Sequence, residues 1–229
     1  MIIAKYTLIR FFKKPVSFAM ACVTPLALMF LSFLWEGDNQ LGLALLTFVV
    51  MSSGFITSQT ILTDRLEGTI TRILVAPISK FRYLTESLIA TSVPIIIQLL
   101  LVATAGMVLH DWSFIFAIAI FICYGALGLA SVAMSFAWYQ SMKSKESSTA
   151  GLSMLITLMA FLGGVFMPLE IMPGILSWIG GIFPVFWAVR GLNEAVTYGE
   201  ITGDYMINIA VMFLFTLGFL YLGAHRRIS

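Results

Sequence analysis

The segment from Asp64 to Ser79 reads DRLEGTITRILVAPIS and lies between two long apolar runs. Its first nine residues carry two acidic side chains and two arginines, whereas only 10% of the whole chain is charged. The chain is 60% hydrophobic, with a mean hydropathy of +1.00. Because a soluble domain is about one quarter charged, this composition predicts an integral membrane protein in which the quoted segment connects two spans.

Six apolar runs are long enough to cross a bilayer, which takes about 20 apolar residues. None of them contains Asp, Glu, Lys, Arg or His, and the first lacks the small-residue cleavage site of a signal peptide. The sequence therefore predicts an all-α integral membrane fold in which residues 1–229 form a single transmembrane domain. The predicted spans are about 16–35, 41–62, 87–109, 113–139, 150–167 and 205–223.

The basic residues gather on one side of these spans. Every Lys and Arg except Arg190 lies before the first span, in the loop after the second or fourth span, or after the sixth. Cytoplasmic loops carry an excess of Lys and Arg, so both termini are expected in the cytoplasm and residues 168–204 outside. Cys22 and Cys123 lie inside apolar runs and are expected to be buried, with no disulfide and no metal site.

The N-terminal segment AKYTLIRFFKKP predicts a short helix that lies in the membrane interface. Its apolar residues recur at helical spacing, and its basic residues fall on the other arc until Pro15 ends the pattern. A plain basic flank that orients the first span is the alternative interpretation. The basic residues of this predicted interfacial helix are Lys5, Arg10, Lys13 and Lys14.

The opening segment predicts a second, cytoplasmic amphipathic helix from Arg65 to Ala76. Asp64 is the expected N-cap, Glu67 completes a capping box, and Pro77 ends the helix. The apolar face contains Leu66, Ile70, Ile73 and Leu74, and the polar face contains Arg65, Gly68, Thr69, Thr71 and Arg72. A helix resting on lipid is the alternative, but its polar face would be basic, whereas this mixed face suits a protein partner.

Residues 165–203 are too apolar for a solvated loop, although three prolines divide them into pieces too short to span a membrane. Short helices that re-enter the membrane from the outer face fit this pattern best, because bent backbone at that depth is tolerated when it packs in protein or lines a cavity. A hairpin lying on the surface is the alternative. The notable residues of this outer region are Pro168, Glu170, Pro173, Pro184 and Arg190.

With these three segments in place, the chain resembles the permease subunits of type 2 ABC exporters along almost its whole length. DRLEGTITRILVAPISKFRYL is similar to the family's cytoplasmic signature, and FLGGVFMPLEIMPGILSWI followed by FPVFWAVRGLNEAV is similar to its outer signature. The short loops make it most similar to the small drug and antibiotic exporters of the daunorubicin type. Gly163-Gly164 departs from the Ser-Gly of many relatives.

The resemblance implies that the helix after the second span is a coupling helix that docks on an ATPase subunit. By position, the segment MKSKESST, with Lys143 and Lys145, is expected to make a second cytoplasmic contact. The chain has no GxxxxGK[ST] motif for ATP phosphates, so ATP and Mg²⁺ are expected on a separate ATPase subunit, with no cofactor and no catalytic residue on this chain. The implied assembly is two ATPases with a homodimer or heterodimer of permeases in a bacterial cell membrane.

Two rival functions are disfavoured by what the spans lack. A secondary transporter usually carries ionisable residues inside its spans, and an intramembrane enzyme would need a catalytic motif that His110 and His225 do not supply. The second span is rich in hydroxyls, which fit helix packing and a substrate path equally: Ser52, Ser53, Thr57 and Ser58. An amphipathic or apolar cargo is expected, a lipid-linked glycan is the alternative, and no nucleic acid partner is expected.

Overall fold

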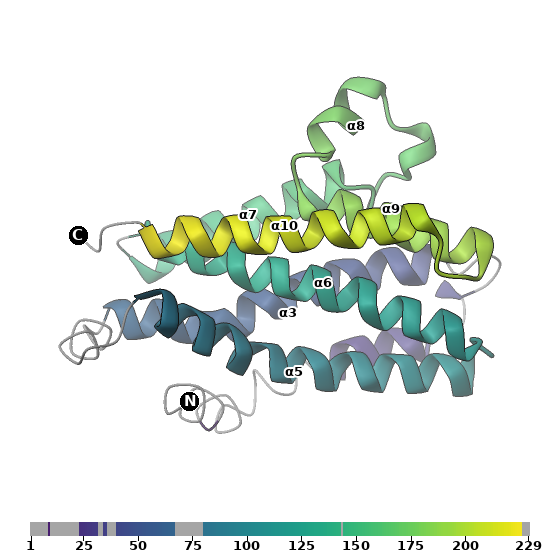
Figure 1. Ribbon diagram of the computed structural model, residues 1–229, viewed down its shortest axis with the longest axis horizontal. Helices are drawn as coiled ribbons and strands as arrows, with labels where there is room; N and C mark the ends of the chain where they lie inside the picture. Colours follow the sequence, from purple (N-terminus) through teal and green to yellow (C-terminus); the bar gives the residue numbers. More distant parts are fainter. Residues whose placement is uncertain are drawn as a thin grey trace.

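The computed structural model describes residues 9, 23–31, 34–35, 40–66, 80–142 and 144–225, and every regular element within these ranges is helical. The long helices lie side by side along the length of the molecule, and α8 projects from the bundle (Figure 1). Residues 23–29 also form helix. The labelled helices are α3 (Gln40–Leu66), α5 (Lys80–Leu109), α6 (Phe114–Tyr139), α7 (Lys145–Leu162), η2 (Leu169–Ile171), α8 (Gly174–Gly180), α9 (Pro184–Tyr198) and α10 (Gly203–His225).

Four of the described helices are long and apolar enough to cross a membrane: α3, α5, α6 and α10. They correspond to the second, third, fourth and sixth predicted spans, and Pro94 is accommodated inside α5 as expected. The helices α8 and α9 meet at a bend of 107° and count as a fifth span only if they are taken together. The predicted fifth span, 150–167, corresponds to α7, which ends earlier at Leu162. The first predicted span lies only partly within the described residues, so the count of six remains a prediction.

The end of α3 corrects one detail of the sequence interpretation. The helix includes Asp64 and ends at Leu66, whereas an N-cap residue has non-helical backbone. Asp64 is therefore not the N-cap of a separate helix, because the second span continues in helical conformation past its last apolar residue. Residues 67–79, which contain most of the predicted coupling helix, lie outside the described part of the chain.

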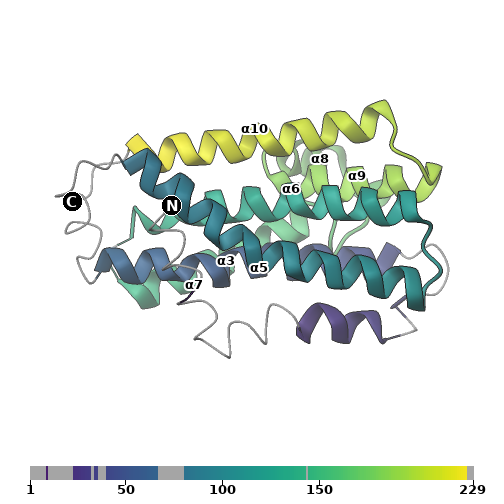
Figure 2. The same cartoon turned by 60° about the horizontal axis from the view of Figure 1, so that its bottom comes forward.

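Helix α6 occupies the centre of the bundle, where it contacts α3, α5, α7, α9 and α10. Figure 2 shows α10, α6 and α5 lying side by side in that order. Small residues allow the close approach: a carbon added at Gly54 of α3 would lie 2.7 Å from Cβ of Ser131, and one added at Gly128 would lie 2.8 Å from Ile95. Small residues thus let α6 pack closely at Gly128 and Ser131, whereas the space beside Gly125 is less restricted.

Three buried tyrosines tie neighbouring helices together through backbone carbonyl groups. The hydroxyls of Tyr124 and Tyr139, both on α6, donate to the carbonyl oxygens of Leu43 and Phe55 on α3, at 2.6 Å and 3.4 Å. The hydroxyl of Tyr205 on α10 donates to the carbonyl oxygen of Ala119 on α6 at 2.5 Å. Each bond provides a partner for a buried hydroxyl, which would otherwise be costly to remove from water.

An aromatic cluster joins the helix at residues 23–29 to the connection between α5 and α6. The indole Nε1 of Trp35 donates to the carbonyl oxygen of Leu28 at 2.9 Å, and Nε2 of His110 lies 2.8 Å from the carbonyl oxygen of Met29. The rings of Trp35 and His110 stack at 4.8 Å, with Trp112 edge-on to Trp35. His110 therefore has a structural partner at the end of its span.

The packing of α3 on α6 can be tested by enlarging Gly54. We expect Gly54→Val to destabilise the protein by about 1–3 kcal/mol, because the added side chain would collide with α6. Gly218→Val on α10 is the matched control, since a carbon added there meets nothing within 4 Å. The measurement is thermal unfolding of the purified protein in detergent, followed by tryptophan fluorescence. Equal unfolding midpoints for the two variants would contradict this account of the helix contact.

Candidate functional site

One face of α3 is only half buried, because it is turned away from α6 and toward α7 and the turn that follows α7. The residues on this face recur at intervals of three and four, the spacing that places side chains on one side of a helix. We call this face the α3 stripe; it consists of Leu41, Ala44, Phe48, Ser52, Ile56 and Gln59. It borders two cavities, one near each end of the helix.

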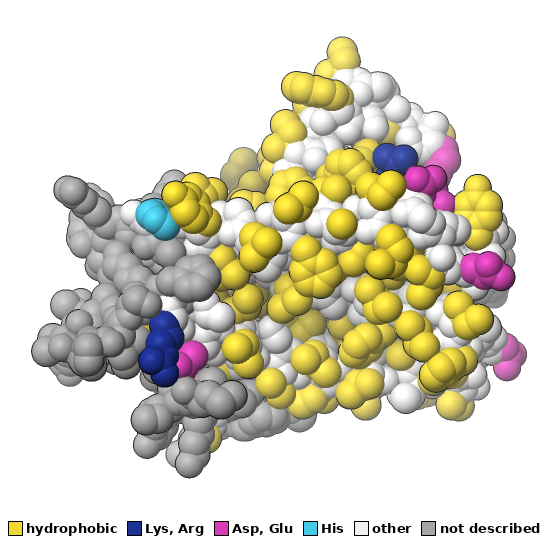
Figure 3. Space-filling model, viewed as in Figure 1, with side chains coloured by type: hydrophobic (Ala, Val, Ile, Leu, Met, Phe, Trp, Pro, Cys, Tyr) yellow, Lys and Arg dark blue, Asp and Glu magenta, His cyan; other side chains and the backbone are white. Residues whose placement is uncertain are grey.

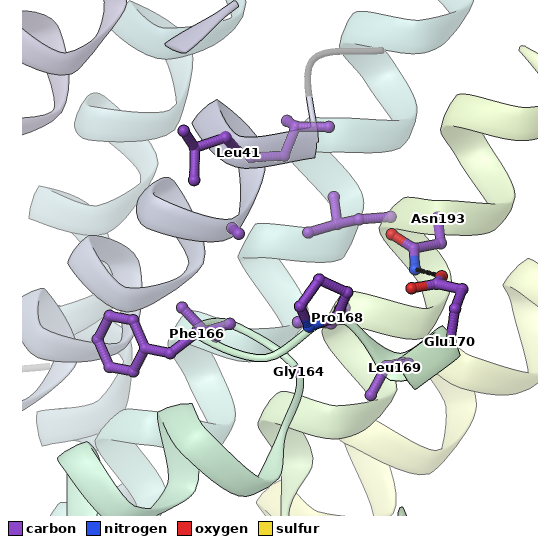
Figure 4. Close-up of a pocket in the computed structure, with 12 residues that line it drawn as sticks. Leu41, Gly164, Phe166, Pro168, Leu169, Glu170 and Asn193 are labelled. Carbon is purple, nitrogen blue, oxygen red and sulfur yellow. Dashed lines mark hydrogen bonds between the residues drawn. The ribbon is translucent and has the colours of Figure 1, made fainter. Parts of the chain in front are cut away.

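The first of these, here called the turn cavity, has a volume of about 230 Å³. It lies between the beginning of α3, the segment 164–170 and α9 (Figure 4). Among the described residues, its walls are apolar except for Glu170 and Asn193. Gly164 shapes the turn with a φ of +90°, which L side chains rarely adopt, and a carbon added there would lie 2.6 Å from the side chain of Leu169.

The second, here called the hydroxyl cavity, has a volume of about 200 Å³ and lies between α3, α7 and the end of α6. Apolar side chains share its lining with six that carry a polar group: Ser52, Gln59, Tyr139, Thr149, Ser153 and Thr157. Thr149 and Thr157 donate to carbonyl groups of their own helix. Ser52, Gln59 and Ser153 line this cavity with their polar side chains, and no hydrogen bond joins these side chains to another residue of the described part of the chain.

A pair of aromatic rings separates the two cavities. Phe48 lines the hydroxyl cavity and Phe166 lines the turn cavity, and their ring centroids lie 5.6 Å apart. Phe161 contacts Phe166 at 5.0 Å from the other side. The contact between the two rings therefore brings the linings of the two cavities together.

The hydroxyl residues of the second span were predicted either to line a substrate path or to pack against other helices. In the structure, one of them lines a cavity and three are buried. Ser52 lines the hydroxyl cavity, whereas Ser53, Thr57 and Ser58 are buried away from it. The hydroxyl of Thr57 donates to the carbonyl oxygens of Ser53 and Gly54, and that of Ser58 donates to Gly54. Bonds of this kind satisfy a buried hydroxyl within its own helix, as expected for residues at a packing surface.

The three prolines of the outer region stand where its short helices begin. Pro168 and Pro173 precede η2 and α8, and Pro184 is the first residue of α9, a position where the missing N–H costs nothing. Oε1 of Glu170 accepts a hydrogen bond from Nδ2 of Asn193 at 3.1 Å, which joins η2 to α9 (Figure 4).

Arg190 lies on α9, and its guanidinium carbon is 6.0 Å from the centroid of the Trp187 ring. The indole Nε1 of Trp187 donates in turn to the carbonyl oxygen of Gly181 at 2.9 Å. The short paired helices of this region are present, and their re-entry into the membrane stays a prediction.

Most residues of the predicted cytoplasmic contacts lie outside the part of the chain that can be described. Lys145 is the first residue of α7, whose N-cap Ser144 accepts a hydrogen bond from the backbone N–H of Ser147. The backbone of Arg65 belongs to the last turn of α3. The predicted residues outside the described ranges are Lys5, Arg10, Lys13, Lys14, Glu67, Gly68, Thr69, Arg72, Pro77 and Lys143.

Titratable side chains are scarce at the cavities. Within the described ranges, no three His, Cys, Asp or Glu side chains are grouped as metal ligands. Cys123 is fully buried, and its Sγ donates to the carbonyl oxygen of Ala188 at 3.4 Å. The arrangement offers apolar surface, hydroxyl and amide groups and one carboxylate, which suits binding rather than bond-making chemistry.

Sequence reasoning missed several residues that line the cavities, among them Phe48, Gln59, Ser153, Phe166 and Asn193. The helical spacing of Phe48, Ser52 and Gln59 was available as a signal that these three share a face. Nothing local indicated that Phe166, which follows α7 in the chain, would contact this face.

The exposure of the α3 stripe can be tested with neighbouring cysteines. In a background with Cys22 and Cys123 replaced by alanine, we expect Ser52→Cys to react with N-ethylmaleimide several times faster than Ser53→Cys. Position 52 lines a cavity, whereas position 53 is 3% exposed, and buried thiols are inert. Modification is followed by mass spectrometry of the purified protein. A faster reaction at position 53 would show that the wrong face of α3 has been assigned to the cavity.

The comparisons with known proteins agree with this arrangement. A family model described as "ABC-2 family transporter protein" matches residues 38–225, which include all of the labelled helices. The chain is also 27% identical over 193 residues to the "Putative transport permease YvfS" of Bacillus subtilis (strain 168), a match that covers 80% of this chain and 75% of that protein. Because the family model spans well over half of the sequence, the chain belongs to the ABC-2 family of transporter proteins.

Proposed function

We propose that this protein is the permease subunit of an ATP-driven exporter and that the α3 stripe lines the route of its substrate. The two cavities on this face and the aromatic contact between them carry the proposal. Members of the family work in a membrane with an ATPase subunit. A permease needs a surface within the membrane that can hold its substrate, and the half-buried face of α3 with its two cavities provides such a surface.

The substrate we propose is amphipathic or apolar, such as a drug, an antibiotic, a peptide or a lipid. The lining of both cavities is largely apolar, and the hydroxyl cavity adds groups that can hydrogen-bond to a polar part of the cargo. This chemistry supports membership of the small drug and antibiotic exporter branch. A lipid-linked glycan remains the second candidate, because free hydroxyl and amide groups also suit a sugar.

The route would be closed by a second permease subunit, identical or related. Leu41, Phe161 and Phe166 stay 55%, 56% and 44% exposed, so the α3 stripe forms a groove rather than a tunnel in one chain. A facing subunit would complete its wall and exclude lipid. ATP and Mg²⁺ would bind a separate ATPase, which we propose to contact the segment after α3 and the beginning of α7.

The orientation we propose has both termini in the cytoplasm. Most of the acidic side chains visible in Figure 3 lie toward the end of the bundle where α5 joins α6 and α9 joins α10, where a basic side chain is also present. A basic side chain lies beside an acidic one near the opposite end. Arg82 lies in the first turn of α5, and Lys145 is the first residue of α7. The distribution supports a cytoplasmic location for the end with the basic residues.

The energy source distinguishes this proposal from secondary transport. In inverted membrane vesicles that contain the permease and its partner ATPase, we expect ATP to drive accumulation of the uncharged amphiphile Nile red. A protonophore should leave the initial rate nearly unchanged, because α6 and the apolar part of α3 contain no Asp, Glu, His, Lys or Arg for proton coupling. Loss of accumulation on adding the protonophore at constant ATP would favour a secondary transporter instead.

The coupling role of the opening segment can be tested at Glu67. We expect Glu67→Lys to insert normally in the membrane but to lose most substrate stimulation of ATPase activity, because it reverses a charge at a proposed protein contact. Since Asp64 lies within α3, the change does not disturb a capping box there. Glu67→Gln, which keeps the shape and removes the charge, should be milder.

Both activities are measured on the same purified complex of permease and ATPase, so that a loss of assembly is separated from a loss of coupling. If Glu67→Lys and Arg72→Glu both keep export and stimulation at wild-type levels, the segment does not couple the subunits and the lipid-resting alternative is favoured.

A further inference from the structure

We propose that the turn cavity binds amphiphiles that carry a positive charge, with Glu170 as the residue that recognises the cationic group. This inference rests on the proposed function in one respect, since it names the substrate class of the same route. The apolar walls would hold the body of the ligand, and the carboxylate at the edge of the cavity would face its ammonium or other cationic group.

The lining of the turn cavity supports this division of roles. Among the described residues that line it, Glu170 is the one ionisable residue and Asn193 is the only other residue with a polar side chain. The remaining side chains are aliphatic or aromatic, apart from Gly164, which has none. A cavity of about 230 Å³ with such walls accommodates an apolar group of moderate size.

The carboxylate of Glu170 is held in position and remains available. Oε1 accepts the hydrogen bond from Asn193, and the side chain is exposed. Within the described ranges Glu170 forms no ion pair, although Arg190 lies nearby on α9 and borders a neighbouring cavity together with Glu170 and Asn193. A ligand cation therefore meets a carboxylate whose charge is not already neutralised by a bound base.

The surrounding charge favours a cation as well. We call this part of the molecule the acidic end; its described charged residues are Asp111, Glu170, Arg190, Glu194, Glu200 and Asp204. Five carboxylates against one guanidinium leave a net charge of −4. A surface of one sign attracts ligands of the opposite sign.

The same carboxylate discriminates against uncharged and anionic amphiphiles. A ligand that fills the apolar cavity covers part of the edge on which Glu170 lies, and so removes water from the carboxylate. Burial of an unpaired charge is costly, and a cationic group on the ligand offsets that cost while an uncharged or anionic group does not. Selectivity should therefore come from Glu170, and affinity from the apolar walls.

Three fluorescent probes with one common body test the proposal: diphenylhexatriene, its trimethylammonium derivative and its propionate derivative. The full-length chain in lipid nanodiscs is titrated with each probe in the absence of ATP, and binding to empty nanodiscs is subtracted. We expect saturable binding to be tightest for the trimethylammonium probe. Glu170→Gln keeps an acceptor for Asn193, and it should weaken binding of this probe about fivefold, as for loss of an exposed ion pair.

Glu194→Gln is the matched control, because it removes a carboxylate from the acidic end that does not line the turn cavity. It should leave the preference for the trimethylammonium probe nearly unchanged. The uncharged probe should bind Glu170→Gln more tightly than the other two proteins, because no unpaired charge is then buried. Equal losses in the two variants would attribute the preference to the general field and overturn the role of Glu170. Tighter binding of the propionate or uncharged probe by the unmodified protein would overturn the proposal altogether.

The titration separates this inference from the proposed function, because it requires neither ATP nor an ATPase. Charge-selective binding in a protein that exports nothing would leave the cavity assignment standing and remove the exporter proposal. ATP-driven export combined with equal binding of the three probes would leave the exporter proposal standing and would overturn the assignment of the turn cavity to cationic amphiphiles.

Discussion

The close contact between α3 and α6 is the constraint on which the rest of the structure depends. Gly54 allows the two backbones to approach at Ser131, and hydroxyls of Tyr124 and Tyr139 bind carbonyl groups of α3 on either side of that point. In a membrane, apolar side chains gain little by leaving lipid for protein, so close packing and buried hydrogen bonds must hold helices together. Once one face of α3 is committed to α6, the opposite face is left for other contacts.

That remaining face gives the protein its candidate function. The α3 stripe meets α7 and the turn after it only in places, so two cavities remain, with Phe48 and Phe166 in contact between them. The buried hydroxyls of Thr57 and Ser58 bond to their own helix, whereas Ser52 lines a cavity. The two sides of one helix thus separate polar groups that bond within the helix from a polar group that lines a cavity.

The segment 164–170, which borders the turn cavity, also contains Glu170, the charged residue of that cavity. Gly164 adopts a backbone conformation that other residues rarely reach, and the chain then places Glu170 against Asn193 of α9. The short helices η2 and α9 are needed for this, because the acid and the amide are far apart in sequence and belong to separate elements. Pro168 and Pro184 stand at the starts of η2 and α9, the two elements that carry this polar pair.

The sequence by itself determined that the chain is a helical membrane protein, and it located α5, α6 and α10 closely, because long uncharged runs form helices in lipid. The small residues in α6 also indicate that neighbouring helices pack closely against it. The assignment of Asp64 as a helix cap was wrong, since a capping pattern cannot show whether the preceding helix has ended. Tertiary structure alone decided which hydroxyls of α3 face a cavity and which meet α6. It also decided that Phe166 contacts Phe48 and that Glu170 meets Asn193, because these pairs depend on how separate helices pack and not on spacing within one of them.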